Sequence, residues 1–313
     1  MRLDKAVASY IAHKQSLGMG VQGDRARLLG FIKTVGNVEM SKISPARVCQ
    51  YLDGTGPVTI NWFTKYYTLS PFYKYAIARH YVDRCHLPLA KPKVPDKFHP
   101  YIYTNEEMRR LIDVADSRHH PMWLIEPHTL RMLLLLLYGT GMRIGEVRRL
   151  NIRDFDRDAG VLTICETKFY KTRYVPLGHD LQQMLCRYLE QQWSRRPHSE
   201  DTPLLADWRG VRLTIQCVEI TFRRLREAAG IRRIEPAHYE PRLQDFRHTF
   251  AVTRLVTWYR EGKNVQRLLP HLSTYLGHLS VKETQHYLDM TTELLEQASI
   301  CFERYARPEV PHV

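Results

Sequence analysis

The stretch Leu272-Ser273-Thr274-Tyr275-Leu276-Gly277-His278-Leu279-Ser280 places a histidine directly after a Leu-Gly step, and Tyr287 follows that histidine nine positions later. Taken alone, the stretch predicts a helix end, a loop and the start of another helix that carries a surface tyrosine. Three polar clusters upstream, around Arg143, Lys168 and Arg247, suit chemistry at a single phosphate together with this pair. We therefore expect a fold in which the four segments meet.

The charge of the chain is its most unusual bulk property. Its 313 residues include 46 Lys and Arg and give a formal net charge of +13, which favours a polyanionic partner such as nucleic acid or an anionic membrane surface. The longest purely apolar run, Met132–Leu137, is far shorter than the ~20 residues of a membrane span. The N-terminus carries charges where a signal peptide needs an apolar core. We expect no membrane partner and a cytoplasmic, nucleoid-associated location.

The six cysteines are scattered and form no CxxC pair, which argues against a disulfide framework and for a reducing compartment. Cys85-His86 is the only adjacent Cys/His pair, and no second pair lies at the spacing of a zinc finger. We therefore predict neither a metal site nor a cofactor.

The length of the chain suggests two domains. Residues 1–87 are predicted to form helices joined by short breaks, and residues 88–100 form a linker rich in proline and lysine, which sustains neither a helix nor a central strand. Residues 101–313 form the second domain. In the first domain, residues 61–81 interleave aromatic side chains with lysines, which indicates either a stacking surface for nucleic acid or an aromatic helical core.

The second domain is predicted to begin with a helix at the capping box Thr104–Glu107. A leucine-rich helix follows and ends at Gly139-Thr140-Gly141. Residues 161–165 and 173–177 are predicted as antiparallel strands, with Lys168 near the bend between them. Nearly everything after Leu181 has helical patterning. The predicted fold class is mostly α with one small antiparallel β-sheet.

The polar clusters carry residues that suit phosphate chemistry. Arg143 follows a glycine turn, and Glu146 three positions later can orient its guanidinium. Two arginines distant in sequence, Arg143 and Arg247, could bind the oxygens of one phosphate through bidentate hydrogen bonds. A lysine at a hairpin tip, Lys168, could donate a proton to a leaving oxygen. Each cluster also has an ordinary alternative, namely an Arg–Glu pair on a solvated face or a charged β-turn.

Four motifs follow one another in the sequence, namely Gly-Thr-Gly-Met-Arg143-Ile-Gly-Glu146, the basic hairpin with Lys168 closed by Val-Pro-Leu, Phe-Arg247-His-Thr-Phe-Ala, and Leu-Gly-His278 with Tyr287. In the order, spacing and flanking residues of these motifs, the chain resembles the tyrosine recombinase (phage integrase) family. These motifs lie in the second domain. The resemblance implies a tyrosine-recombinase catalytic domain preceded by a helical, SAM-like core-binding domain that clamps double-stranded DNA.

The resemblance also implies a role for each motif residue. Tyr287 would be the nucleophile that forms a 3′-phosphotyrosyl link, and Arg143 and Arg247 would bind the scissile phosphate. Lys168 would protonate the leaving 5′-oxygen, and His278 would donate to a phosphate oxygen. A phenol of pKa about 10 needs nearby cations to react near pH 7. The covalent intermediate conserves bond energy, so the reaction needs neither ATP nor a metal.

Two supporting positions follow from the same resemblance. Glu146 would be the acidic supporter of the site. Gln244 stands where the family usually has histidine, three positions before Arg247, and a glutamine can donate a hydrogen bond but cannot exchange a proton. The long interval between Arg247 and His278 is similar to transposon-borne members. The resemblance implies a site-specific recombinase that serves the integration, excision or transposition of a mobile element.

Two other functions stay open. Gln244 motivates a DNA-binding accessory protein with a degenerate recombinase fold, and a type IB topoisomerase would use similar chemistry as a monomer. The tail beyond Tyr287 has an apolar stripe, which either packs on its own domain or docks into a neighbouring protomer. The resemblance implies a homo-oligomer on DNA, with a tetrameric synapse and possible partner recombinases.

Overall fold

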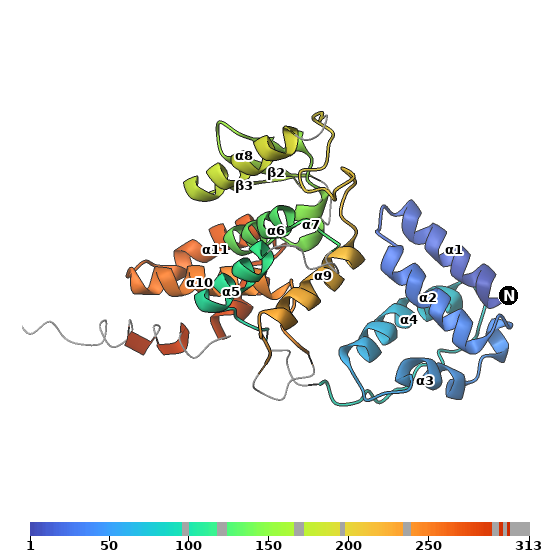
Figure 1. Ribbon diagram of the computed structural model, residues 1–313. Coiled ribbons are helices and arrows are strands. Elements are labelled where there is room, and N and C mark those ends of the chain that lie inside the picture. Colours follow the sequence, from blue (N-terminus) through green and yellow to red (C-terminus); the bar gives the residue numbers. More distant parts are fainter. Residues whose placement is uncertain are drawn as a thin grey trace, which may run out of the picture. The chain divides into compact units, whose positions relative to one another are not determined.

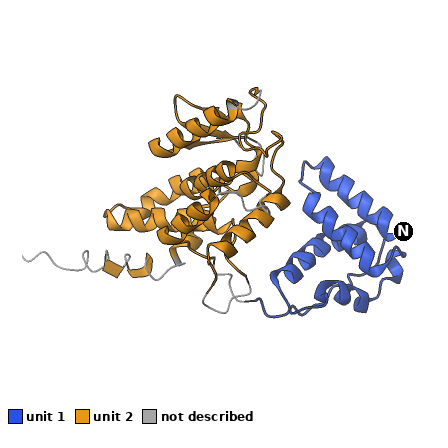
Figure 2. Cartoon of the chain, viewed as in Figure 1, with its two compact units in different colours: residues 1–98 blue, residues 99–313 orange. Residues whose placement is uncertain are grey.

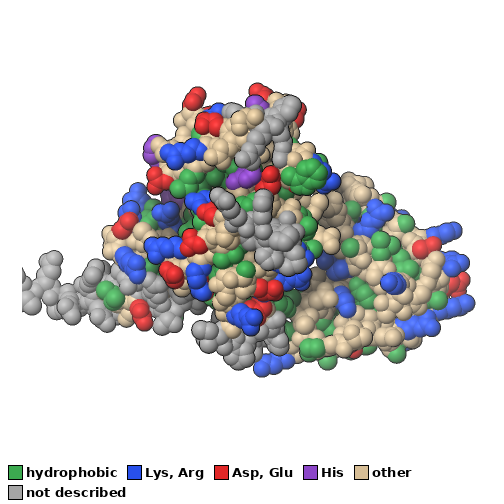
Figure 3. All heavy atoms as spheres, viewed as in Figure 1, with side chains coloured by type: hydrophobic (Ala, Val, Ile, Leu, Met, Phe, Trp, Pro, Cys, Tyr) green, Lys and Arg blue, Asp and Glu red, His purple; other side chains and the backbone are tan. Residues whose placement is uncertain are grey.

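The computed structural model describes residues 1–95, 100–117, 124–165, 172–194, 198–233, 239–289, 294–296 and 299–300. The chain divides into two compact units, residues 1–98 and residues 99–313 (Figure 2). Lys and Arg side chains are spread over the viewed face of both units (Figure 3). No helix among the described residues is long and apolar enough to cross a membrane.

The first unit is helical, with elements α1 (Leu3–Ser16), α2 (Gln22–Val35), η1 (Met40–Lys42), α3 (Pro45–Asp53) and α4 (Ile60–Ala78) (Figure 1). Helix α3 begins at a serine cap, because Ser44 accepts a hydrogen bond from the backbone N–H of Arg47 and Pro45 occupies the first helical position. The four main helices enclose one apolar core.

The aromatic residues of α4 mainly form core. Trp62 and Phe63 are buried, and Phe72 and Tyr73 are fully buried, so the helical-core interpretation holds for them. Tyr67 is different, because it is 60% exposed. The Lys91 ammonium lies 4.8 Å from the centroid of the Tyr67 ring, a cation–π contact within the first unit.

The second unit contains α5 (Asn105–Asp116), α6 (Pro127–Thr140), α7 (Ile144–Arg149), η2 (Ile152–Asp154), β1 (Phe155–Asp156), β2 (Val161–Ile164), β3 (Arg173–Pro176), α8 (His179–Trp193), α9 (Ile215–Ala228), α10 (Asp245–Arg260), α11 (Val265–Leu276), α12 (Val281–Gln285) and η3 (His286–Asp289). The strands pair antiparallel in the order β1-β2-β3. The predicted fold class is therefore confirmed. The short strand β1 is an addition that the sequence did not predict.

Helix α6 is the centre of this unit. Its leucines are buried on nearly every side, and it packs against α5, α8 and α10, as expected for a helix that is apolar all round. The helix ends at Gly141, whose φ of 63° is a left-handed conformation that glycine adopts readily. A Cβ on Gly141 would lie 2.6 Å from Phe250 of α10. The glycine thus lets α6 end against α10, immediately before Arg143.

Helices α10 and α11 share a second apolar cluster, which also buries Tyr287 and Leu294. At Leu294, therefore, the tail packs on its own unit, which is one of the two predicted alternatives. The tail residues Ala298, Cys301, Phe302 and Tyr305 lie outside the described residues.

Candidate active site

Arg143 is the N-cap residue of α7, and Glu146 fixes it from two sides. The Arg143 backbone N–H donates to Glu146 Oε2 at 2.8 Å, and its Nη1 donates to Glu146 Oε1 at 3.1 Å. The side chain of Arg143 is 38% exposed while that of Glu146 is 10% exposed. The guanidinium is therefore held in one orientation by a buried carboxylate and still faces solvent.

Arg173, the first residue of β3, is a member of the site that sequence reasoning missed. Its Nη1 and Nη2 donate to the two oxygens of Glu146 at 2.9 and 2.8 Å, and its Nε donates to the Tyr275 carbonyl at 3.0 Å. Burial disfavours the charged form of Glu146, but the hydrogen bonds and charge of Arg173, with those of Arg143, outweigh it and lower the pKa of Glu146 to about 2. Glu146 is thus an anion shared by two arginines.

Arg247 lies on α10 and is 2% exposed. Its Nη1 donates to the Gly141 carbonyl at 2.9 Å and its Nη2 to the Leu276 carbonyl at 2.7 Å. Burial, followed by the nearby charge of Arg143, lowers the pKa of Arg247 to about 10, so it remains a cation at neutral pH. These two bonds join the turn after α6 to the turn after α11, and they bring the two distant motifs together.

His278 follows Gly277, which ends α11 with a φ of 70°. A Cβ on Gly277 would lie 2.8 Å from Arg173 Nη1, so the Leu-Gly-His step needs its glycine. The Nδ1 of His278 lies 2.7 Å from the Thr284 hydroxyl, a partner that the sequence did not indicate. Burial and the surrounding arginines lower the pKa of His278 to about 3. A neutral ring whose Nδ1 accepts from Thr284 keeps Nε2–H as a donor.

Tyr287 is 3% exposed, so the surface tyrosine suggested by its own stretch is wrong. Its ring lies between two histidines, with centroid distances of 6.0 Å to His278 and 5.6 Å to His248. Burial raises the pKa of the Tyr287 phenol, and Arg247 and Arg143 oppose that shift. Among the described residues, the buried Nδ1 of His248 has no hydrogen-bond partner, and burial lowers the pKa of His248 to about 4.

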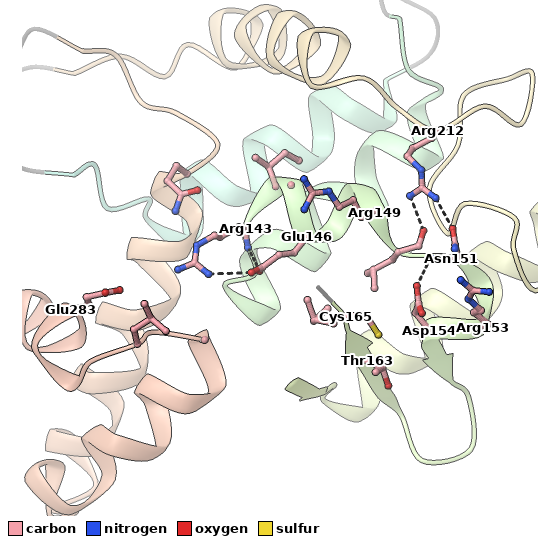
Figure 4. Close-up of a pocket in the computed structure, with 17 residues that line it drawn as sticks. Arg143, Glu146, Arg149, Asn151, Arg153, Asp154, Thr163, Cys165, Arg212 and Glu283 are labelled. Atoms are coloured by element: carbon pink, nitrogen blue, oxygen red, sulfur yellow. Dashed lines mark hydrogen bonds and ion pairs between the residues drawn. The ribbon is translucent and has the colours of Figure 1, made fainter. Parts of the chain in front are cut away.

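Gln244 is the N-cap residue of α10 and lines a cavity of about 1120 Å³ with Arg143 and Gly277. The cavity continues past Glu146 and Arg149 to Asn151 and Arg212 (Figure 4). Cys165, at the end of β2, also lines it. Lys168 itself lies outside the described residues. Among the residues that are described, no group of three or more His, Cys, Asp or Glu could hold a metal ion.

The structure thus brings together Arg143, Glu146, Arg247, His278 and Tyr287, which come from α7, α10, the turn after α11 and η3. Two fixed guanidinium groups near a phenol and a neutral histidine can bind an anion and stabilise charge that develops on it. Arg173 and Thr284 support these residues, because Arg173 binds Glu146 and the Thr284 hydroxyl contacts His278.

Comparisons with known proteins agree with this geometry. A family model described as "Phage integrase family" matches residues 102–293. The protein y4rB of Sinorhizobium fredii, of the integrase/recombinase type, is 32% identical over 306 residues, which cover 96% of both chains. The tyrosine recombinase XerC of Oceanobacillus iheyensis is 30% identical over 239 residues, covering 74% of this chain and 70% of that protein.

Solved structures share the fold. The Tn1549 transposon integrase in complex with a circular intermediate DNA has a TM-score of 0.71 at 15% identity, with 98% of this chain and 100% of that chain covered. A lambda integrase dimer bound to a COC' core site has a TM-score of 0.63 at 20% identity, with 90% of this chain and 97% of that chain covered.

Proposed function

The chain belongs to the phage integrase family of tyrosine recombinases, and from this premise we propose that it cuts and rejoins DNA through a covalent bond to Tyr287. The observation that supports the proposal most directly is the pair of arginines. Arg143 and Arg247 reach the site from different helices, each fixed by short hydrogen bonds, and both influence the titration of Tyr287.

In the proposed first step, Tyr287 loses its phenolic proton to water and its oxygen attacks the phosphorus of a DNA phosphodiester. The bond from phosphorus to the 5′-oxygen breaks, and the phosphate remains as an ester between Tyr287 and the 3′ end. Lys168 gives a proton to the departing 5′-oxygen. Arg143, Arg247 and the Nε2–H of His278 stabilise the extra negative charge on the phosphate oxygens as phosphorus becomes five-coordinate.

In the second step a 5′-hydroxyl gives its proton to Lys168 and its oxygen attacks the phosphorus. The bond from phosphorus to Tyr287 breaks and the phenol regains a proton, so strands are rejoined without external energy. Gln244 lines the cavity and would donate a hydrogen bond there, but an amide cannot take the phenolic proton of Tyr287. Because Tyr287 is buried and does not line the cavity, cleavage also requires that DNA binding bring the phenol and the phosphate together.

A nicked suicide substrate tests the proposal. Loss of the short fragment at the nick should trap wild-type protein as a covalent DNA adduct, and Tyr287→Phe should give none while it still binds the same DNA. The loss of one hydroxyl leaves the buried ring in place, so the variant should fold normally. If Tyr287→Phe traps adducts as wild type does, Tyr287 is not the nucleophile.

A second candidate, motivated by Gln244, is an accessory protein that binds DNA but has lost catalysis. Gln244→His discriminates between the two. An inactive protein that becomes strongly active with histidine favours the accessory function, whereas a wild type that already forms adducts and changes little excludes it. A plasmid relaxation assay run beside a two-site recombination assay tests the type IB topoisomerase alternative, for which only relaxation is expected.

The substrate and assembly belong to the same proposal. The similar lambda integrase structures contain a dimer on a core site and a tetramer on a Holliday junction, and the similar Tn1549 integrase is a transposon protein. We propose double-stranded DNA as the partner, a homo-oligomer on that DNA, a role in a mobile element, and a nucleoid-associated location. The domain organisation with a core-binding first unit is proposed on the same basis.

A further inference from the structure

The cavity at the site extends well beyond the residues that the proposed chemistry uses. Its far part is lined by Arg149 at the end of α7, by Asn151, and by Arg212 in the turn before α9. In the view of Figure 4, Arg149 lies between Arg143 and Arg212. None of these three residues has a role in the proposed strand cleavage.

Arg212 is held in a fixed position by neutral groups. Its Nη1 donates to the Arg148 carbonyl at 2.7 Å, and its Nη2 donates to the Asn151 side-chain oxygen at 2.6 Å. Asn151 is itself fixed, since its backbone N–H donates to Asp154 at 2.8 Å. These bonds position the Arg212 guanidinium, but carbonyl oxygens do not neutralise its charge.

The neighbouring arginines increase the excess of positive charge. Arg148 donates to the Leu213 carbonyl at 2.5 Å, and its buried Nε has no partner among the described residues. Arg149 is exposed, and within the same described part of the chain nothing pairs with it. Burial and the charges of Arg148 and Arg149 lower the pKa of Arg212, which is the expected effect of like charges held together.

Of the acids that line the cavity, Glu283 lies at its other end, on the far side of Arg143 from Arg212 (Figure 4). Glu146 is shared by Arg143 and Arg173, and Arg153 forms an ion pair with Asp201 at 2.5 Å. Asp154 partly offsets the charge of Arg212, but it is a single carboxylate against three guanidinium groups. A cluster of this kind is stabilised by binding an anion, and arginine suits phosphate through its planar fork of donors.

We propose that Arg149 and Arg212 form a second phosphate site, which binds a non-scissile phosphate of the DNA strand that the proposed function places at Arg143 and Arg247. Arg148 and Asn151 hold Arg212 in this site through the hydrogen bonds that they accept from it. The inference rests on the proposed function for the identity of the strand. A phosphate contact carries no base information, so the site sets the register of the backbone and thereby positions the scissile phosphate over the cavity.

The first experiment measures binding and needs no cleavage. In a Tyr287→Phe background, the affinity for a duplex oligonucleotide is measured across a salt series with Arg149→Gln, and with Arg109→Gln as the matched control. Arg109 is also exposed on this unit, in a surface pair with Glu106, and does not line the cavity. Arg149→Gln should reduce the slope of log affinity against log salt concentration by the contribution of about one phosphate contact. Arg109→Gln should leave this slope unchanged.

The second experiment identifies the phosphate. Suicide substrates carry one uncharged methylphosphonate at each position beside the scissile phosphate, and single-turnover adduct formation is measured. At one of these positions, the methylphosphonate should slow adduct formation by wild type roughly 10- to 100-fold, as loss of a charged hydrogen bond does. On unmodified DNA, Arg149→Gln should form adducts more slowly than wild type by a similar factor. Placing the methylphosphonate at the sensitive position should then slow this variant little further.

The outcomes are separable from those of the proposed function. If Tyr287→Phe still forms adducts, the proposed chemistry fails while the binding experiment stays valid. If Arg149→Gln has wild-type salt dependence and remains as sensitive as wild type to every methylphosphonate, the second phosphate site does not exist. Arg149 is used because its side chain forms no hydrogen bond or ion pair with any described residue. Arg212→Gln removes bonds to Arg148, Leu150 and Asn151, so it serves only as a confirming variant.

Discussion

Arg173 donates two parallel hydrogen bonds to Glu146, at 2.9 and 2.8 Å, and Glu146 in turn accepts from both the backbone and the side chain of Arg143. Arg173 also donates to the Tyr275 carbonyl two residues before Gly277. One buried arginine on the sheet therefore positions both the Arg143 guanidinium and the turn that carries His278, without lining the cavity itself.

Arg173→Lys should lower single-turnover adduct formation roughly 10- to 100-fold, because a lysine cannot reproduce the bidentate geometry or the bond to Tyr275. DNA affinity should change much less, since Arg143 keeps its charge. Arg157→Lys is the control, as Arg157 also pairs with a glutamate, Glu190, but at the surface. Equal loss of affinity and of cleavage would argue against a positioning role for Arg173.

Glu146→Gln should destabilise the fold in a pH-dependent way. The pKa of Glu146 falls from 4.5 to about 2 on folding, so its contribution is fully present above pH 4.5 and is lost as the pH falls towards 2. At pH 7 the expected loss of unfolding free energy is about 3 kcal/mol. Urea unfolding at a series of pH values measures it. The gap between wild type and variant should narrow below pH 4.5, and a constant gap would contradict the assignment.

Thr284→Val should slow adduct formation about tenfold, because it removes the hydroxyl that fixes the tautomer and ring orientation of His278. Thr284→Ser keeps the hydroxyl and should restore most of the rate. Indistinguishable rates for valine and serine would mean that Thr284 only fills space.

Gly141→Ala should lower the free energy of unfolding by about 2 kcal/mol or more, since an L residue is strained at its φ of 63° and its Cβ would lie 2.6 Å from Phe250. Gly145→Ala is the matched control, because no atom of the described residues, apart from its chain neighbours and its own helix backbone, lies within 4 Å of its Cβ position. Thermal or urea unfolding measures both variants, and comparable stability for the two would contradict the tight α6–α10 contact.

The sequence predicted those parts of the site that depend on the conformation of nearby backbone. Gly141 and Gly277 end helices in left-handed conformations, so Arg143 and His278 could be placed at turns from the sequence. The supporting contacts are not local. Arg173 lies 27 positions from Glu146 and 102 from Tyr275, and no periodicity shows which strand faces which turn.

A signal for Arg173 existed nonetheless. Arg173 and Val175 share the buried face of β3, while Tyr174 between them is 69% exposed. A charged residue on the inward face of an alternating strand requires a buried partner, and Glu146 is that partner. The burial of Tyr287 had no comparable signal, because it depends on the packing of α10, α11 and the tail rather than on its own segment.

The two carbonyl bonds of Arg247 have a consequence for the choice of inactive alleles. A substitution at Arg247 removes a residue proposed to bind phosphate, and it also removes the hydrogen bonds that join the turns after α6 and α11. The phenotype of such a mutant would combine lost chemistry with misfolding. In a cell, such an allele would resemble a deletion and could not reveal whether the bound protein has effects of its own. Tyr287→Phe keeps these hydrogen bonds and removes only the proposed nucleophile, so it is the inactive allele to choose for genetic work on this recombinase.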